Sequence, residues 1–225
     1  MRVLFLFGLL LLAACSGSGP GKPSDSDVPM AALAAPAQTL VFECSDDYSF
    51  IARTGPGEIA LWLEDRYEVL GQVRSASGSK YEDGTTLFWS KGTAATLTVD
   101  GQEHTDCVSV PARVPWEDAR RRGVDFRATG NEPGWYLEMQ RDRQMLFVGN
   151  YGRQRVFTPW VDARANGDRG QTYHAITEAH DLRIDILEDT CQDTMADSVY
   201  SHTVRVRLDG KELQGCGMWL EYPWE

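Results

Sequence analysis

The feature that most constrains this chain is an alternation of apolar and polar residues with a period of two, which recurs along its length. It is clearest in Ile59–Leu63, Ala95–Val99, Leu182–Ile186 and Val204–Leu208. This period places apolar side chains on one face of a β-strand. No segment of about 12 residues shows a helical period, and turn signals recur every ~8–12 residues. We therefore expect an all-β chain of short antiparallel strands, arranged as sandwiches or small barrels.

Length and charge limit the organisation and the partners. The chain has 225 residues and a formal net charge of −11, so it can form two small domains. Residues 38–111 hold 12 acidic and 5 basic side chains, a net charge of about −7. This acidity argues against a nucleic-acid partner and favours a basic one.

The N-terminus has the features of an export signal. Arg2 precedes an apolar run at residues 3–12 that is too short to span a bilayer. The following Leu-Ala-Ala-Cys resembles the processing box of bacterial lipoproteins. This predicts a signal peptide over residues 1–14 and a lipid on Cys15. The alternative is a plain secretory peptide that leaves a free cysteine.

Residues 15–37 begin with that cysteine and continue as a tether rich in Gly, Pro and Ser. Ser16, directly after the cysteine, favours release to the outer membrane. We expect a lipid-anchored protein that faces the periplasm of a Gram-negative bacterium.

The most distinctive motif lies in the first predicted domain. A Ser/Gly-rich loop at Ser75–Tyr81 leads to Asp83-Gly84, which supplies the positive φ of a tight turn. The strand after it ends in Phe88-Trp89-Ser90-Lys91-Gly92. Phe88 and Ser90 point to one face of this strand, whereas Trp89 and Lys91 point to the other.

This pattern, with a cysteine at each end of about residues 39–107, resembles the membrane-bound inhibitors of C-type lysozyme (MliC) from Gram-negative envelopes. The resemblance implies an eight-stranded barrel over residues 38–110. It also implies that Ser77 and Lys91 match the serine and lysine that the family inserts into the lysozyme cleft. Gly78 would allow a close backbone approach, and Lys80 and Tyr81 are further candidate contacts.

Simpler interpretations exist for each of these residues. On spacing alone, Lys91 is an exposed strand lysine and Ser77 a turn residue that caps its own loop. We interpret Phe88 and Trp89 as core and loop support, and Tyr81 fits either role. Ala94 stands where the resemblance predicts a glutamate, which puts a supporting salt bridge in doubt.

The four remaining cysteines are predicted to pair, because an exported chain meets an oxidising compartment. Of the three possible connectivities, Cys44–Cys107 with Cys191–Cys216 keeps each bridge inside one predicted domain. A metal site is disfavoured because the chain has no Cys-x-x-Cys pair.

Residues 111–124 contain two prolines and an arginine triplet, and they are predicted to form a linker that is extended or makes one helical turn. The triplet is a weak patch for anionic lipid, so we favour a solvated linker. Residues 125–225 are predicted to form a second all-β domain. Its phrases Gly130–Trp135, Cys191–Met195 and Gly215–Gly217 resemble an uncharacterised domain of envelope lipoproteins.

Nothing in the sequence indicates catalysis or a cofactor. The four histidines lack metal-ligand spacing, and no nucleophile motif is present. Glu132 is the most suggestive acid, but it lies in a Gly-Asn-Glu-Pro turn that favours a structural role. The leading hypothesis is a lipid-anchored inhibitor of a basic host C-type lysozyme. The alternative is a non-catalytic structural or ligand-binding lipoprotein that acts through its C-terminal domain.

Overall fold

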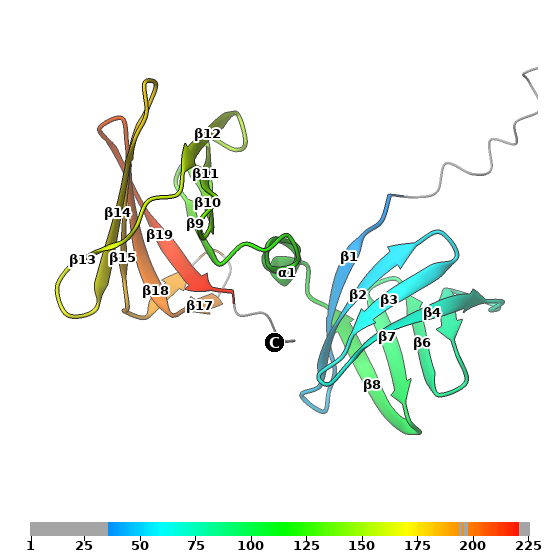
Figure 1. Cartoon of the computed structure of the whole chain (residues 1–225). Coiled ribbons are helices and arrows are strands. Elements are labelled where there is room, and N and C mark those ends of the chain that lie inside the picture. Colours follow the sequence, from blue (N-terminus) through cyan, green and yellow to red (C-terminus); the bar gives the residue numbers. More distant parts are fainter. Residues whose placement is uncertain (1–35, 194, 196–197, 221–225) are drawn as a thin grey trace, which may run out of the picture. The chain divides into compact units, whose positions relative to one another are not determined.

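The computed structural model describes residues 36–193, 195 and 198–220, and these residues form three β-sheets (Figure 1). The predicted signal peptide, Cys15, Ser16 and the tether up to residue 35 lie outside the described residues. The three sheets are a closed eight-stranded barrel, a nine-stranded sheet and a two-stranded sheet. The expected all-β fold is therefore confirmed. None of the described helices has the length and apolar character needed to cross a bilayer.

The barrel is a sequential antiparallel meander. Its strands are β1 (Thr39–Glu43), β2 (Ser49–Gly55), β3 (Glu58–Trp62), β4 (Tyr67–Val73), β5 (Ser79–Glu82), β6 (Thr86–Lys91), β7 (Ala94–Val99) and β8 (Gln102–Ser109). β1 pairs with β8 at Phe42↔Ser109 and so closes the barrel. Closure leaves no strand edge unpaired, which removes a site of unwanted strand addition.

The barrel interior is built from the alternating residues that the sequence indicated. Ile59, Leu61 and Leu97 are fully buried. The rings of Phe42, Phe50 and Phe88 pack at its centre, with centroids 5.3–5.8 Å apart. Aromatic residues supply much of the apolar area that a barrel of this size can bury.

The turn between β5 and β6 is held by one carboxylate. Asp83 Oδ1 accepts hydrogen bonds from the backbone N–H groups of Thr85 (3.0 Å) and Thr86 (2.9 Å). These bonds from Thr86 and Thr85 hold the pKa of Asp83 below its usual value. Gly84 has φ 102°, which agrees with the predicted need for a positive φ.

The segment predicted to be an extended or single-turn linker is instead a 3₁₀ turn, Pro111–Arg113, followed by an eight-residue helix, α1 (Val114–Arg121). No side chain caps its N-terminus. The helix is supported by burial: Trp116 and Ala119 pack with Val124 and Leu220. Tertiary contacts can hold a helix that its own sequence favours only weakly.

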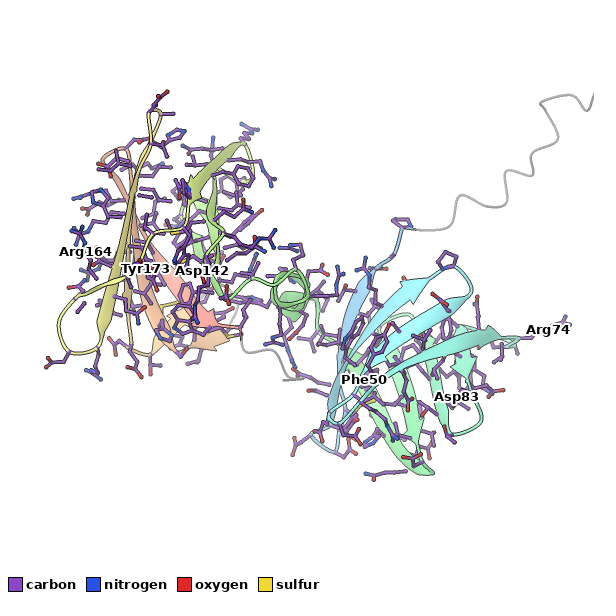
Figure 2. All side chains as sticks on the ribbon, viewed as in Figure 1. Phe50, Arg74, Asp83, Asp142, Arg164 and Tyr173 are labelled. Carbon is purple, nitrogen blue, oxygen red and sulfur yellow. A yellow bond between two sulfur atoms is a disulfide. The ribbon has the colours of Figure 1, made fainter. Side chains whose placement is uncertain are left out.

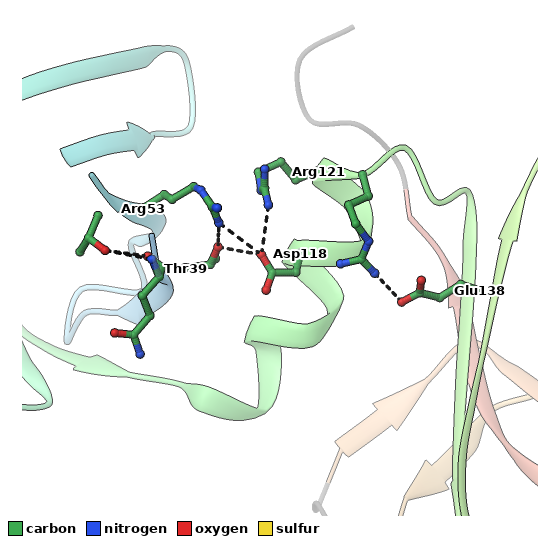
Figure 3. Close-up of polar contacts among 8 residues, drawn as sticks. Thr39, Arg53, Asp118, Arg121 and Glu138 are labelled. Carbon is green, nitrogen blue, oxygen red and sulfur yellow. Dashed lines mark hydrogen bonds and ion pairs between the residues drawn. The ribbon is translucent and has the colours of Figure 1, made fainter. Parts of the chain in front are cut away.

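The polar residues of α1 also have partners (Figure 3). Asp118 accepts a hydrogen bond from Thr39 Oγ1 at 2.7 Å, and its Oδ1 lies 3.8 Å from Arg53 Nη1. The arginine triplet is fully paired, as Arg120–Glu117, Arg121–Asp118 and Arg122–Glu138. The triplet is thus not a free basic patch for lipid, although Arg121 and Arg122 stay exposed to solvent.

The nine-stranded sheet is antiparallel in the order β12-β11-β10-β9-β19-β18-β15-β14-β13. Its strands are β9 (Phe126–Asn131), β10 (Gly134–Gln140), β11 (Gln144–Gly149), β12 (Gln154–Pro159), β13 (Arg164–Ala165), β14 (Gly170–Ile176), β15 (Asp181–Leu187), β18 (His202–Leu208) and β19 (Lys211–Trp219). The two-stranded sheet is β16 (Cys191–Asp193) paired with β17 (Ser198–Tyr200). Leu182, Ile184, Val204 and Val206 are buried on one face, as their alternation predicted.

The three phrases singled out after residue 125 meet in space. Asn131 Nδ2 donates to Asp193 Oδ1 at 2.7 Å. A Cβ on Gly215 would lie 2.0 Å from the carbonyl oxygen of Thr129 and 2.8 Å from Trp135 Cζ2. Only glycine permits this close approach. Glu132 lies exposed in the two-residue turn between β9 and β10, which fits its interpretation as a turn residue.

Both predicted disulfides are present, Cys44–Cys107 and Cys191–Cys216. The paired cysteines are 63 and 25 residues apart in the sequence, respectively. The first joins residues of the barrel, and the second joins β16 to β19. Each bridge limits the freedom of the unfolded chain between its two cysteines.

Candidate functional site: the loop end of the barrel

Two neighbouring connections of the barrel hold the predicted contact residues. They are the β4–β5 loop, residues 74–78, and the β6–β7 turn, residues 92–93. Together with Lys91, the last residue of β6, we call these residues the loop end. Ser79 pairs with Ser90, and Lys91 pairs with Ala94 across the turn. Because β5 begins where β6 ends, Ser77 and Lys91 come from adjacent strands at the same end of the barrel.

Hydrogen bonds fix the backbone of this loop. The indole Nε1 of Trp89 donates to the carbonyl oxygen of Ser77 at 2.9 Å. Within the loop, Ser75 Oγ donates to the carbonyl oxygen of Gly78 at 2.9 Å. Trp89 points to the outer face of β6, 44% exposed, while Phe88 is fully buried. Phe88 therefore serves the core and Trp89 supports the loop, as predicted.

Gly78 brings the loop against β6. Its φ is +69°, and a Cβ at this position would lie 2.2 Å from the carbonyl oxygen of Ser90. The same Cβ would lie 3.3 Å from Lys91 Cβ, so the backbone beside Ser77 packs on the base of the lysine side chain. Any larger residue would push the loop away. The close approach that the sequence suggested for Gly78 is to the barrel's own strand.

The loop end also holds the unpaired cations of the barrel. Arg66 pairs with Asp65, Glu68 and Asp100, while Arg53 lies near Asp118 and Lys80 pairs with Glu82. Among the described residues, no carboxylate lies within ion-pair distance of Arg74 or Lys91, and both are exposed. Arg74 projects from the tip of the β4–β5 loop (Figure 2). The loop end thus presents hydrogen-bond donors and positive charge on an otherwise acidic barrel.

Residues 42–106 match the family model described as "Membrane-bound lysozyme-inhibitor of c-type lysozyme". The barrel is an MliC-like domain. A curated protein of Yersinia enterocolitica, named "Membrane-bound lysozyme inhibitor of C-type lysozyme", is 34% identical over 64 residues. That match covers 28% of this chain and 55% of the relative, so the chain spans little more than half of the relative's length. No solved structure matches the chain.

Two further predicted contact residues of the MliC-like domain have other partners. Lys80 Nζ lies 2.9 Å from Glu82 Oε2, so its charge is already neutralised. Tyr81 is only 6% exposed, and its ring packs 6.2 Å from that of Phe88. Of the two roles left open for Tyr81, burial assigns its ring to the core. A contact of Tyr81 with a partner stays a prediction.

The structure adds Arg74 to the candidate contacts and shows what Ala94 places beside Lys91. Arg74 was not among the predicted contacts, although it directly precedes the Ser75 phrase. A sequence cannot say which cations lack a carboxylate partner, and this lack is what distinguishes Arg74. Ala94 is exposed and faces Lys91 across the turn, so it brings no carboxylate to that lysine.

Other titratable groups of the described residues make structural pairs. His104 Nδ1 lies 2.7 Å from Asp46 Oδ2, and the hydrogen bond from His104 lowers the pKa of Asp46. On the nine-stranded sheet, His180 Nδ1 lies 2.8 Å from Asp209 Oδ2. The described residues contain no group of three or more His, Cys, Asp or Glu side chains placed to hold a metal ion.

Proposed function

We propose that this protein inhibits a C-type lysozyme by placing the loop end of its MliC-like domain in the active-site cleft. The single observation that carries the proposal is that Gly78, next to Ser77, packs against the base of Lys91, an exposed lysine with no carboxylate within ion-pair distance among the described residues. The match of residues 42–106 to an inhibitor family supports the proposal, and the similar protein of Yersinia enterocolitica is named as a lysozyme inhibitor. The likeness to an inhibitor family points to a non-catalytic protein.

The chemistry of the cleft explains why a lysine and a serine suit this role. A retaining glycosidase has two carboxyl groups about 5–5.5 Å apart. One of them is kept protonated by an apolar setting so that it can act as general acid. Lys91 would donate charge-assisted hydrogen bonds to both carboxyl groups. Its positive charge would also lower the pKa of the general acid, which removes the proton that catalysis requires.

Ser77 would add a neutral donor beside the ammonium group. Its hydroxyl can donate to a carboxylate while its own carbonyl oxygen is held by Trp89. The loop would therefore enter the cleft with its backbone already ordered. Pre-ordering reduces the conformational entropy lost on binding.

Charge favours the encounter with a basic enzyme. The chain carries a formal charge of −11, and about −7 of it falls in residues 38–111. An acidic barrel would attract a basic lysozyme at long range, while the cations of the loop end would meet its acidic cleft. Raising the ionic strength should slow association.

The proposed function includes a place for the protein in the cell. We propose that Cys15 carries a lipid and holds the protein in the cell envelope, at the outer membrane and facing the periplasm. An inhibitor held there would protect peptidoglycan from lysozyme that enters the periplasm. Metabolic labelling with a fatty-acid analogue would test the anchor, with Cys15→Ser expected to lose the label.

Inhibition kinetics test the proposed function. A soluble chain that begins at Ser16 retains every described residue and can be mixed with a C-type lysozyme. Lysis of bacterial cell walls should slow, and a soluble oligosaccharide that occupies the cleft should compete with the inhibitor. Inhibition that the oligosaccharide leaves unchanged would place the contact outside the cleft, and no inhibition would contradict the proposal.

A further inference from the structure

The outer face of the nine-stranded sheet carries a cluster of arginines that the proposed function leaves unexplained. Arg205 and Arg207 point outward from β18, between the buried Val204, Val206 and Leu208. Arg183 of β15 lies directly opposite Arg207 in the strand register. We call Arg183, Arg205 and Arg207 the basic face.

One cross-strand pair on this face opposes the charge preferences of a sheet. Side chains directly opposite one another on antiparallel strands are close, and like charges there are destabilising. The Arg183–Arg207 pair is of this kind. A cluster of three arginines is also unusual in this chain, which is strongly acidic, with 33 Asp and Glu against 22 Lys and Arg.

Two acidic residues share this face: Asp185 lies opposite Arg205 and Glu212 lies opposite Arg207 in the strand register. Asp185 is already engaged. Asp185 accepts hydrogen bonds from Arg183 at 3.1 Å and from the hydroxyl of Thr172. Burial raises the pKa of Asp185, but these hydrogen bonds outweigh it, and the pKa lies below its usual value. Asp185 thus pairs with Arg183, and Arg207 also helps to lower its pKa. Within the described part of the chain, no carboxylate lies at ion-pair distance from Arg205 or Arg207.

A hollow of about 470 Å³ lies over the same residues. Its lining includes Arg183, Asp185, Arg205, Arg207, Glu212 and Gln214. Arg205 and Arg207 are two residues apart on one strand, so their side chains leave the backbone about 6.6–7 Å apart. Two guanidinium groups at this spacing can hold a phosphate group between them by bidentate hydrogen bonds.

We propose that the basic face binds the phosphate groups of anionic phospholipid headgroups. The lipid anchor proposed for Cys15 selects this occupant. Twenty-three residues lie between Cys15 and Thr39, where β1 begins, and this length spans at most about 85 Å. The folded part of the chain thus stays near a membrane surface, where even a weak phosphate site would be occupied.

This proposal rests on the lipid anchor proposed for Cys15 but not on lysozyme inhibition, because it concerns a different sheet and a different partner. Membrane contact through the basic face would orient the protein on its tether. The loop end lies on the barrel and contributes none of the residues that line the hollow. A failure of lysozyme inhibition would therefore leave the membrane proposal standing, and the reverse also holds.

Vesicle binding tests the proposal. The soluble chain that begins at Ser16 would be sedimented with vesicles of phosphatidylcholine, alone or mixed with phosphatidylglycerol. We expect binding only to the anionic vesicles, weakening as salt is added. Arg205→Gln with Arg207→Gln should weaken this binding by about tenfold or more.

A matched pair of arginines supplies the control. Arg153→Gln with Arg155→Gln removes the same charge at the same spacing, from an exposed segment that does not line the hollow. This variant should bind anionic vesicles within about twofold of the wild type. An equal loss in both variants would overturn the proposal, because it would reduce the effect to net charge.

Two further measurements distinguish phospholipid binding from a structural role of the arginines and from binding of a different anion. Arg207→Gln should melt close to the wild-type temperature, because Arg207 lies opposite both the like-charged Arg183 and the oppositely charged Glu212. A clear drop would give Arg207 a structural role and contradict the proposal. The wild type could instead bind purified peptidoglycan or inorganic phosphate but no vesicles. If the Arg205/Arg207 variant then lost that binding, the membrane assignment would be overturned.

Discussion

The barrel and the nine-stranded sheet use the same alternation of residues but leave their cations free in different places. In the barrel, cations inside the strands are paired, as Lys80 is with Glu82, whereas the unpaired Arg74 and Lys91 lie directly after β4 and at the last residue of β6. In the nine-stranded sheet, the unpaired Arg205 and Arg207 lie in the middle of a strand. The loop end of the closed barrel is narrow enough to enter an enzyme cleft. The outer face of the nine-stranded sheet is a wide surface that suits a membrane.

The largest expected effect compares the two disulfides. Removing Cys44–Cys107 by Cys→Ser changes should cost about 4 kcal/mol of unfolding free energy, and removing Cys191–Cys216 about 3 kcal/mol, because the first closes the longer loop. Denaturant unfolding followed by fluorescence measures both. The Cys191/Cys216 variant should still inhibit lysozyme. A loss of inhibition there would mean that the site is not confined to the barrel.

A glycine comparison sharpens the geometry of the loop end. Gly78→Ala would put a Cβ 2.2 Å from the carbonyl oxygen of Ser90, at a φ of +69°. We expect a stability loss of about 1–3 kcal/mol and inhibition weakened about tenfold or more, because Ser77 would move. Gly84→Ala is the control, since it has a positive φ but no atom within 4 Å. It should lose stability and keep inhibition; equal inhibition by both variants would contradict the packing role of Gly78.

The indole donor of Trp89 should have a smaller effect. Trp89→Phe keeps an aromatic ring on the outer face but removes the hydrogen bond to the Ser77 carbonyl. The net worth of such a bond is about 0.5–1.5 kcal/mol, which corresponds to inhibition about two- to tenfold weaker. Trp62→Phe is a matched change on the same barrel. If both variants inhibit like the wild type, the loop does not depend on this bond.

The smallest effect concerns the turn at the other end of β5. Asp83→Asn removes the negative charge that strengthens the hydrogen bonds from the backbone N–H groups of Thr85 and Thr86. The free energy of unfolding should fall by about 1 kcal/mol or less at neutral pH. The pKa of Asp83 is lowered in the folded state, so its contribution is present above the unfolded-state pKa and is lost as the pH falls through the folded value. Wild type and variant should therefore converge in acid, below about pH 4. A gap that widens in acid would contradict this sign.

Alternation predicted the strands and the core, because burial on one face is a local property of a strand. Ile59 and Leu61 in the barrel, and Val204 and Val206 in the nine-stranded sheet, are buried as expected. Barrel closure came from the family resemblance rather than from this pattern. Closure depends on the pairing of β1 with β8, which are far apart in the sequence.

The helix α1 escaped prediction for a physical reason. It has only eight residues, begins beside two prolines and has no side-chain cap. It is stabilised by the burial of Trp116 and Ala119, which no local pattern reports.

The candidate site was predictable in its residues but not in its contacts. The resemblance named Ser77 and Lys91, and the structure packs Gly78, the residue after Ser77, against the base of Lys91. Alternation assigned Trp89 to the outer face, yet it could not reveal the bond from its indole to Ser77. In the same way, it placed Tyr81 on a strand without deciding that its ring is buried.

The most direct test of lysozyme inhibition through the loop end compares two lysines of the barrel. Lys91→Ala and Lys80→Ala each remove one positive charge, but Lys80 is already paired with Glu82 whereas Lys91 has no carboxylate partner among the described residues. Inhibition constants against a C-type lysozyme should rise about a hundredfold or more for Lys91→Ala, because a buried charged contact is lost. They should change by less than about threefold for Lys80→Ala. Equal inhibition by Lys91→Ala and wild type would contradict the central claim.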